Sequence, residues 1–281
     1  SGSYTFNATI GAENSNNVTV TVMAEMPEVP ADPQPANLAF NHRGLFVDHT
    51  GINCGYCTSV LDVFRSLAET DAHKHYNEVT VHAGGYATGD PANSDAANKV
   101  NQFYAPSGYP DVRLNFYTGS PASRSVQGFT NILMSYIKKN GADAGISMAV
   151  EGDNTKIYCA AQVKSAKSQE YKAVAWLLEN GIYSPNQAGA TKDYHKIYDY
   201  ALRNISGSYS KANISGESIG TVANGETYDC AFELPIISTK WKYENMGVLV
   251  IVSAKDAQGR WEIANTAYCK LGESKEYEYV E

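Results

Sequence analysis

The sequence predicts an α/β domain followed by a mainly antiparallel β-sandwich domain with one inserted helix. Residues 37–144 alternate short apolar strand patterns with apolar residues at helical spacing. Residues 145–281 instead alternate apolar and polar residues at a period of two. A chain of 281 residues also suits two domains better than one. We therefore expect an N-terminal strand and Pro-rich linker over 1–36, then domains over 37–144 and 145–281.

The N-terminal region predicts one strand and a stiff connection. Val and Thr alternate from Val18 to Val22, which is typical of a strand. Prolines then recur at nearly every third residue, from Pro27 to Pro35, and such spacing favours an extended linker.

Residues 37–144 predict the order β-α-β-α-β-β-α. A strand, a helix and a second strand of this length imply a parallel pair with a right-handed crossover. Ser94 is a candidate cap for the second helix, and Asn140-Gly141 ends the last one. The predicted elements are strands 45–48, 79–82 and 112–116, a hairpin turn at 118–120, and helices over 54–70, around 100–104 and over 129–137.

Residues 145–281 predict strands with one exception. Alternating or continuous apolar runs mark strands at 157–163, 228–234, 248–252 and 261–271. The exception has apolar residues at helical spacing, which predicts one inserted helix through Tyr194, Ile197, Tyr198, Ala201 and Leu202.

The tetrad Cys54-Gly55-Tyr56-Cys57 points to thiol chemistry. It stands where a buried strand turns into a helix, and free N–H groups at a helix start favour a thiolate. A lowered thiol pKa is the basis of thiol–disulfide exchange. A c-type haem site would need His where Thr58 stands, and a structural zinc site would need a second cysteine pair nearby. An inert structural pair remains an alternative.

Charge and hydropathy limit the partners. The net charge is −8 without a cluster of Lys and Arg, so we expect no nucleic-acid partner. The longest apolar run, from Gly247 to Ala254, is too short to span a bilayer. Low charged content of 19% and 20 tyrosines suit an exported, β-rich protein. A removed leader or a lipid-anchored cysteine would lie outside this sequence.

Residues 37–144 resemble the thioredoxin-like superfamily. Asp48 lies six residues before Cys54, where thioredoxins have a buried acid, and Gly108-Tyr109-Pro110 is similar to their loop with a cis proline. The resemblance implies that Asp48 moves the proton of the second thiol and that the Pro110 loop faces the tetrad. Asn53 stands where these proteins usually have Trp.

A larger part of the chain resembles the outer-membrane lipoprotein family named for a twenty-eight-kilodalton protein of Gram-negative anaerobes. This resemblance implies export to the periplasm or the outer-membrane surface of a Gram-negative bacterium. It also implies a thioredoxin-like domain followed by a β-rich one. The residues that show it are Phe46 to Gly51, Gly108 to Pro110, Trp176 to Ile182, Pro185, Gln187, Tyr194-His195 and Leu202-Arg203.

The leading functional hypothesis is an exported thiol–disulfide oxidoreductase or isomerase. Cys54, which we expect to be the more exposed thiol, would attack a client disulfide, and Cys57 would resolve the mixed disulfide. Asp48 would be the base for Cys57. The predicted substrate-binding residues are Gly55, Tyr56, Tyr109 and Pro110. No metal or cofactor is expected.

The expected partners are proteins with disulfides or thiols, with a membrane-bound redox partner as a further possibility. Contact with a membrane would come only through a lipid anchor. The rival hypothesis is a redox-inactive binding or adhesion module on the same fold. A third option, a peroxidase-like thiol enzyme, has only Thr50 and Thr58 to activate its nucleophile.

The other histidines and cysteines predict structural roles first. His49 and His82 end predicted strands and would either hydrogen-bond locally or contact Asp48 or the thiols. His73 and His75 lack a third metal ligand nearby, and His195 suits a structural hydrogen bond. For the remaining cysteines, buried free thiols or one bridge both stay open: Cys159, Cys230 and Cys269.

Overall fold

The protein is described from a computed structural model, which covers residues 26–207 and 214–280, and four strands within residues 2–22. Its helices are α1 (Thr58–Leu67), α2 (Asp95–Tyr104) and α3 (Val126–Tyr136), with four short 3-10 helices: η1 (Asp71–His75), η2 (Gly84–Ala87), η3 (Asp193–Lys196) and η4 (Tyr243–Asn245). The predicted strand from Val18 to Val22 is confirmed as β4, which pairs with β1 (Gly2–Phe6). The other N-terminal strands are β2 (Thr9–Ile10) and β3 (Glu13–Asn14).

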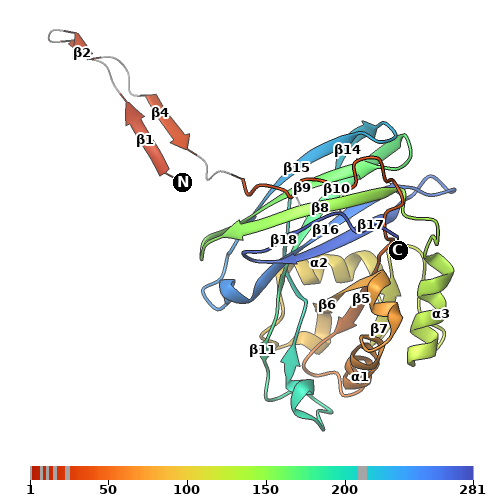
Figure 1. Cartoon of the computed structure of the whole chain (residues 1–281). Coiled ribbons are helices and arrows are strands. Elements are labelled where there is room, and N and C mark those ends of the chain that lie inside the picture. Colours follow the sequence, from red (N-terminus) through yellow and green to blue (C-terminus); the bar gives the residue numbers. More distant parts are fainter. Residues whose placement is uncertain are drawn as a thin grey trace.

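A large sheet runs through most of the described chain (Figure 1). Its order is β17-β16-β10-β13-β6-β5-β7, and β14 pairs with β10 beside this path. The members are β5 (Gly44–Thr50), β6 (Tyr76–His82), β7 (Asp111–Leu114), β10 (Gln169–Glu179), β13 (Ala201–Ile205), β14 (Glu217–Val222), β16 (Met246–Lys255) and β17 (Trp261–Lys270).

A second sheet of four strands has the order β15-β9-β8-β18. These strands are β8 (Ala144–Gly152), β9 (Lys156–Ser165), β15 (Thr227–Pro235) and β18 (Ser274–Lys275). A separate ribbon pairs β11 (Ile182–Tyr183) with β12 (Ile197–Tyr198).

Alternation along the strands places three hydrophobic cores on the two faces of the large sheet. On β10, Leu177 faces the second sheet, while Trp176 faces the core that includes α2. On β5, Val47 joins the α2 side, and Phe46 packs against α1 and α3. The large sheet is thus covered by α2 on one face, and by α1, α3 and the second sheet on the other.

The first half follows the predicted element order closely. The strands β5 and β6 are parallel, as the crossover rule requires, and the Ser94 side chain caps α2 by accepting from Ala97 N at 3.0 Å. Helix α1 begins at Thr58, because the tetrad forms turns before it. The predicted hairpin after β7 has no second strand, since only an isolated bridge joins Leu114 to Gly119.

The predicted helix through Tyr194 and Leu202 is wrong. The segment forms η3, β12 and β13 instead, with a left-handed turn at Tyr200 (φ 53°). Its apolar residues do not share one face: Tyr198 packs with Ala92, while Leu202 enters the α2 core. Tertiary packing of separate positions overrides the local helical spacing.

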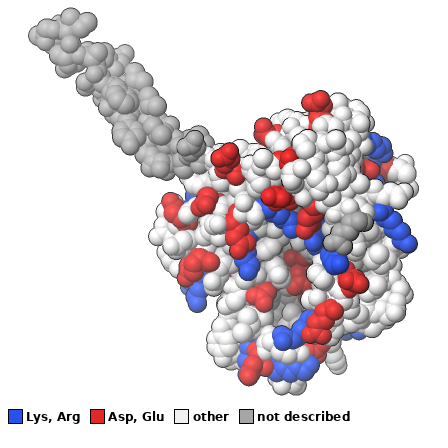
Figure 2. Space-filling view, viewed as in Figure 1, with Lys and Arg blue, Asp and Glu red and all other residues white. Residues whose placement is uncertain are grey.

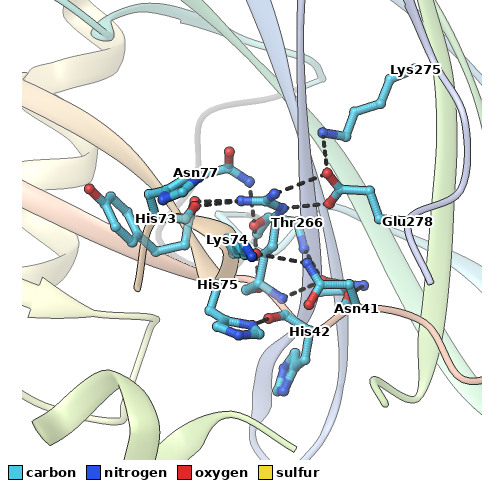
Figure 3. Close-up of polar contacts among 12 residues, drawn as sticks. Asn41, His42, His73, Lys74, His75, Asn77, Thr266, Lys275 and Glu278 are labelled. Carbon is cyan, nitrogen blue, oxygen red and sulfur yellow. Dashed lines mark hydrogen bonds and ion pairs between the residues drawn. The ribbon is translucent and has the colours of Figure 1, made fainter. Parts of the chain in front are cut away.

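The two halves of the chain are joined along the sheet and at its edge. Strand β13 pairs with β6 in parallel, at Ala201 and Thr80. Figure 3 shows a second junction, where Glu278 pairs with Lys275. The Glu278 carboxylate also pairs with the Arg43 guanidinium. Arg43 in turn donates to the carbonyl of His73 at 2.9 Å. Strands of both halves belong to one sheet. The division into two domains at residue 144 therefore stays a prediction.

The drawn surface and the helices match the charge and hydropathy of the sequence. Figure 2 shows acidic and basic side chains interspersed on the face that it draws. Among the described residues, every helix is too short or too polar to cross a bilayer.

Candidate redox site

The tetrad lies at the carboxyl ends of β5 and β6, where ligand and active sites gather in parallel sheets. A disulfide joins Cys54 and Cys57. Both cysteines are equally buried, each 2% exposed, so the expectation that Cys54 is the more exposed thiol is wrong in this oxidised state. Between them Tyr56 is 77% exposed, beside an exposed Gly55.

Asp48 is sealed beneath this region. It shares with Phe46 and Thr50 the face of β5 that α1 covers, and both of its carboxylate oxygens are buried without a hydrogen-bond partner. Burial and, to a smaller extent, the nearby Asp111 carboxylate raise the pKa of Asp48 to about 8, while Arg124 opposes the rise. Asp48 is therefore mostly protonated at neutral pH.

Glu78 is a second carboxyl on the same face of the sheet, one that the sequence did not single out. It lines a cavity of about 420 Å³ between α1 and the sheet, with Tyr76, Tyr200 and Asp199. Burial, then Asp48 and Asp199, raise the pKa of Glu78 to about 8. The site thus contains two carboxyl groups that are neutral at pH 7.

A segment of the second half covers the tetrad. We call residues 184–191, which connect β11 to η3, the strap. Ala188 N donates to Ile52 O at 2.8 Å, and Gln187 Nε2 donates to Cys54 O at 3.1 Å. Gly189 lies so close that a Cβ there would be 2.1 Å from the Gly55 carbonyl oxygen. The strap explains why both sulfurs are buried although the tetrad stands in a loop.

Asp62 on α1 fastens the residues that follow the strap. Its Oδ1 accepts from His195 Nε2 at 2.9 Å, from Lys192 Nζ at 2.9 Å and from the Tyr194 hydroxyl at 2.5 Å. Burial alone would raise the pKa of Asp62, but these three hydrogen bonds hold it below its ordinary value. His195 thus has the structural role that the sequence suggested.

A small void lies directly against Cys57. It measures about 10 Å³, which is room for roughly one water molecule. His82, the last residue of β6, lines this void, and its Nδ1 lies 2.8 Å from Asp90 Oδ2. The remaining lining residues are Thr50, Thr58, Leu61, Thr80, Gln187 and Tyr198.

The loop with Pro110 is linked to the tetrad through Tyr86. The Tyr109–Pro110 peptide bond is cis, as the resemblance implied. The Tyr109 ring stacks on Tyr86 at 5.0 Å, and its hydroxyl donates to Ala83 O at 3.0 Å, so this side chain points away from the surface. The Tyr86 carbonyl in turn accepts from Asn53 N at 2.9 Å.

The second-half cysteines belong to a different environment. Cys159, Cys230 and Cys269 are free and buried in the core between the two sheets, so the bridge alternative is wrong. Burial raises the pKa of Cys230 to about 12 and that of Cys269 to about 11. Within the described ranges, clusters of His, Cys, Asp or Glu able to hold a metal are absent, including at His73 and His75.

Sequence reasoning missed several members of the site. Asp90 lies in the loop between η2 and α2 and belongs to no motif. Gln187 was noted only for the family resemblance, and Tyr198 was assigned to a helix. Gln187 and Tyr198 line the void against Cys57 although they are distant from it in the chain, and the family resemblance offered a signal for Gln187 alone.

Comparisons with known proteins agree with an exported, β-rich chain. The profile of the outer membrane protein Omp28 family matches residues 97–275. Among solved structures, HBP35 of Porphyromonas gingivalis superposes with a TM-score of 0.64 at 15% identity, over 85% of this chain and 78% of that one. Protein AGR_C_4864 from Agrobacterium tumefaciens gives 0.51 at 14% identity, over 82% and 95%. No curated protein matches the sequence.

Proposed function

This chain belongs to the outer membrane protein Omp28 family, and on that premise we propose that it is a thiol–disulfide oxidoreductase or isomerase acting on protein disulfides. Family membership makes it an exported protein of the outer membrane or cell surface of a Gram-negative bacterium. The matched residues 97–275 include Pro110 but begin after the tetrad. The family therefore supports the location, and the redox chemistry rests on the surroundings of Cys54 and Cys57.

The observation that supports the activity most is the placement of the disulfide. It stands between the end of a parallel strand and the start of α1, with a neutral, buried carboxyl at Asp48 on the face below. A helix start stabilises a thiolate, and thiolates are the reactive species of exchange. The order β5-α1-β6-α2-β7-α3 and the cis peptide before Pro110 also support a thioredoxin-like domain over 37–144.

The proposed reaction is a two-electron exchange. The Cys54 thiolate attacks a client disulfide, and one client sulfur leaves as a thiolate that takes a proton from solvent. Cys57 then loses its proton and attacks Cys54 Sγ, which re-forms the Cys54–Cys57 disulfide and releases the second client sulfur. Asp48 is the base that the resemblance suggests. Gly55, Tyr56 and the Tyr109-Pro110 backbone would contact the client, and a membrane-bound redox partner would restore the starting state.

A second candidate function is a redox-inactive binding module. The strap favours it, because the two sulfurs are only 2% exposed and a folded client cannot reach them while the strap is in place. The exposed ring of Tyr56 would then belong to a docking surface without exchange.

Trapping of mixed disulfides separates the two candidates. The Cys57→Ala variant, reduced and then mixed with a scrambled, disulfide-bonded ribonuclease, should form a covalent adduct through Cys54. Cys54→Ala is the matched control and should form none. An exchange-competent site also equilibrates with glutathione buffers at a defined potential. If the Cys57→Ala variant forms no adduct and the disulfide does not titrate in such buffers, the binding-module function replaces the enzyme.

A further inference from the structure

Cys57 faces a small polar chamber rather than a solid apolar core. The void against it is lined on the opposite side by His82, and the strands place Thr50 directly beside His82 in the parallel register. The imidazole is only 2% exposed. Since the void has room for roughly one water, that water would contact both the thiol and the imidazole.

Asp90 fixes which nitrogen of His82 holds the proton. One carboxylate oxygen, Oδ2, accepts from His82 Nδ1 at 2.8 Å and from Ile52 N at 2.7 Å, while Oδ1 accepts from Ala92 N at 2.8 Å. Burial alone would raise the pKa of Asp90, but His82 and the two backbone N–H groups outweigh burial and lower it. An ionised Asp90 keeps the proton on Nδ1 and leaves Nε2 with a free lone pair.

The free nitrogen has no competing partner. Across the described residues, His82 Nε2 makes no hydrogen bond, and the ring packs against Tyr198 at 4.3 Å between centroids. Tyr198 donates its hydroxyl to Gln187 Oε1 at 2.7 Å, so it does not occupy the imidazole nitrogen. His82 is therefore held in one orientation, and its Nε2 is the ring nitrogen that has no hydrogen bond to the described part of the protein.

We propose that His82, oriented by Asp90, accepts the proton of Cys57 through the water of this void during the resolving step. This inference rests on the exchange activity proposed above. Cys57 gives its proton to the water, and the water gives a proton to His82 Nε2. The Cys57 thiolate then attacks Cys54 Sγ, and the client sulfur leaves as a thiolate. The Asp90 carboxylate stabilises the imidazolium that forms. When the strap lifts, the void opens to solvent, and His82 releases the proton to water.

Other charged groups around His82 agree with this role. The residues around the ring come from three elements: Asp90 from the loop before α2, Cys57 from the start of α1 and Tyr198 from β12. A cation, Arg203 on β13, donates to the carbonyl of Pro91, the residue after Asp90, at 3.0 Å. Among the residues that the structure describes, Asp90 is the carboxylate that hydrogen-bonds the ring. Asp48, by contrast, is without any hydrogen-bond partner, and its raised pKa leaves few ionised molecules at pH 7.

The test isolates the resolving step. Cys54 is loaded with thionitrobenzoate, and the attack of Cys57 is followed by release of the coloured thiolate from pH 5 to pH 10. His82→Gln should slow release roughly 10²-fold near pH 7, the scale of general-base catalysis, and approach the parent rate at alkaline pH. Asp90→Asn, in which the imidazole remains but its carboxylate is lost, should show the same change in pH profile to a smaller extent.

Matched controls distinguish the alternatives. His73→Gln removes an exposed histidine and should leave the profile unchanged, and Asp48→Asn tests the base that the family resemblance suggests. If His82→Gln matches the parent while Asp48→Asn is slow, the proposal is overturned and Asp48 is the base. If the parent itself never releases thionitrobenzoate, the exchange activity fails. The Cys57 alkylation profile in Cys54→Ser then tests His82 alone, because loss of the base should shift that profile to higher pH.

Discussion

Two groups of cysteines are almost equally buried in this protein, yet their surroundings differ in kind. Cys54 and Cys57 are 2% exposed, and polar groups line the space next to Cys57: His82, three threonines and Gln187. Cys159 is 0% exposed, and with Cys230 and Cys269 it packs among the aliphatic side chains of the two-sheet core. Burial alone therefore does not decide whether a thiol reacts. The two groups differ in the polar space next to Cys57 and in the strap that covers the tetrad.

The largest effect should come from removing the nucleophile. Cys54→Ser should reduce disulfide exchange on scrambled ribonuclease to the uncatalysed rate, because Cys54 is the proposed nucleophile of the first attack. Cys159→Ala, a matched loss of a buried thiol in the other group, should keep its exchange rate. Equal exchange rates in the two variants would show that the different surroundings of the two cysteine groups do not determine which thiol reacts.

The core thiols should be protected until the protein unfolds. Ellman reagent should label Cys159, Cys230 and Cys269 at least about 10³-fold more slowly in the native state than in denaturant, since exposing a core requires roughly 5 kcal/mol or more. Their raised pKa values act in the same direction. Rapid labelling of any of the three in the native protein would contradict their assignment to the core.

Asp48 should make stability depend on pH. Its pKa is about 8 in the fold against an ordinary 3.8, so the folded state keeps a proton that the unfolded chain loses. Stability should fall as pH rises from about 4 to about 8, and Asp48→Asn should remove this fall, gaining on the order of 5 kcal/mol at pH 8.

Urea denaturation of both proteins at pH 4 and pH 8 measures the effect of Asp48. The pH 4 pair is the internal control, since the carboxyl is then mostly neutral in the folded state and only partly ionised in the unfolded one. An Asn variant that is no more stable than the parent at pH 8 would show that Asp48 is ionised in the fold.

Loosening the strap should have the smallest effect. Asp62→Asn weakens the hydrogen bonds to Lys192, Tyr194 and His195, so reduction of the Cys54–Cys57 disulfide by dithiothreitol should accelerate about tenfold, the change expected from losing roughly 1.4 kcal/mol of closure. Asp71→Asn, at an exposed aspartate that pairs with Lys74, is the control. If both variants are reduced at the parent rate, the strap does not limit access.

Local signals in the sequence predicted much of the first half. The strand, tetrad and helix follow from apolar periodicity, the Ser94 cap from its residue type, and the cis Pro110 from the family resemblance. Asp48 was identified through the resemblance to thioredoxins, which have a buried acid at this position, and its carboxyl is buried in the structure. These features depend on a few neighbouring residues, which is why pattern reasoning reached them.

The rest of the site depends on contacts between distant parts of the chain. Gln187 reaches Cys54 across a separation of 133 residues, and no local pattern encodes that contact. The residues from Tyr194 to Leu202 had a helical spacing that tertiary packing overrode. Asp90 has no motif, because its role is set by the backbone N–H of Ile52 and by His82 rather than by its sequence neighbours.

The pairing of β13 with β6 has a consequence for the order in which the protein matures. The Thr80 hydroxyl and the Asp199 carbonyl are 119 positions apart in the chain, and Thr80 also pairs with Ala201. Such distant contacts form late in folding. We expect the tetrad to be open while the first half folds, so its disulfide forms before the strap closes over it. Pulsed alkylation during refolding would show this sequence of events, and early protection of Cys54 in the reduced chain would contradict it.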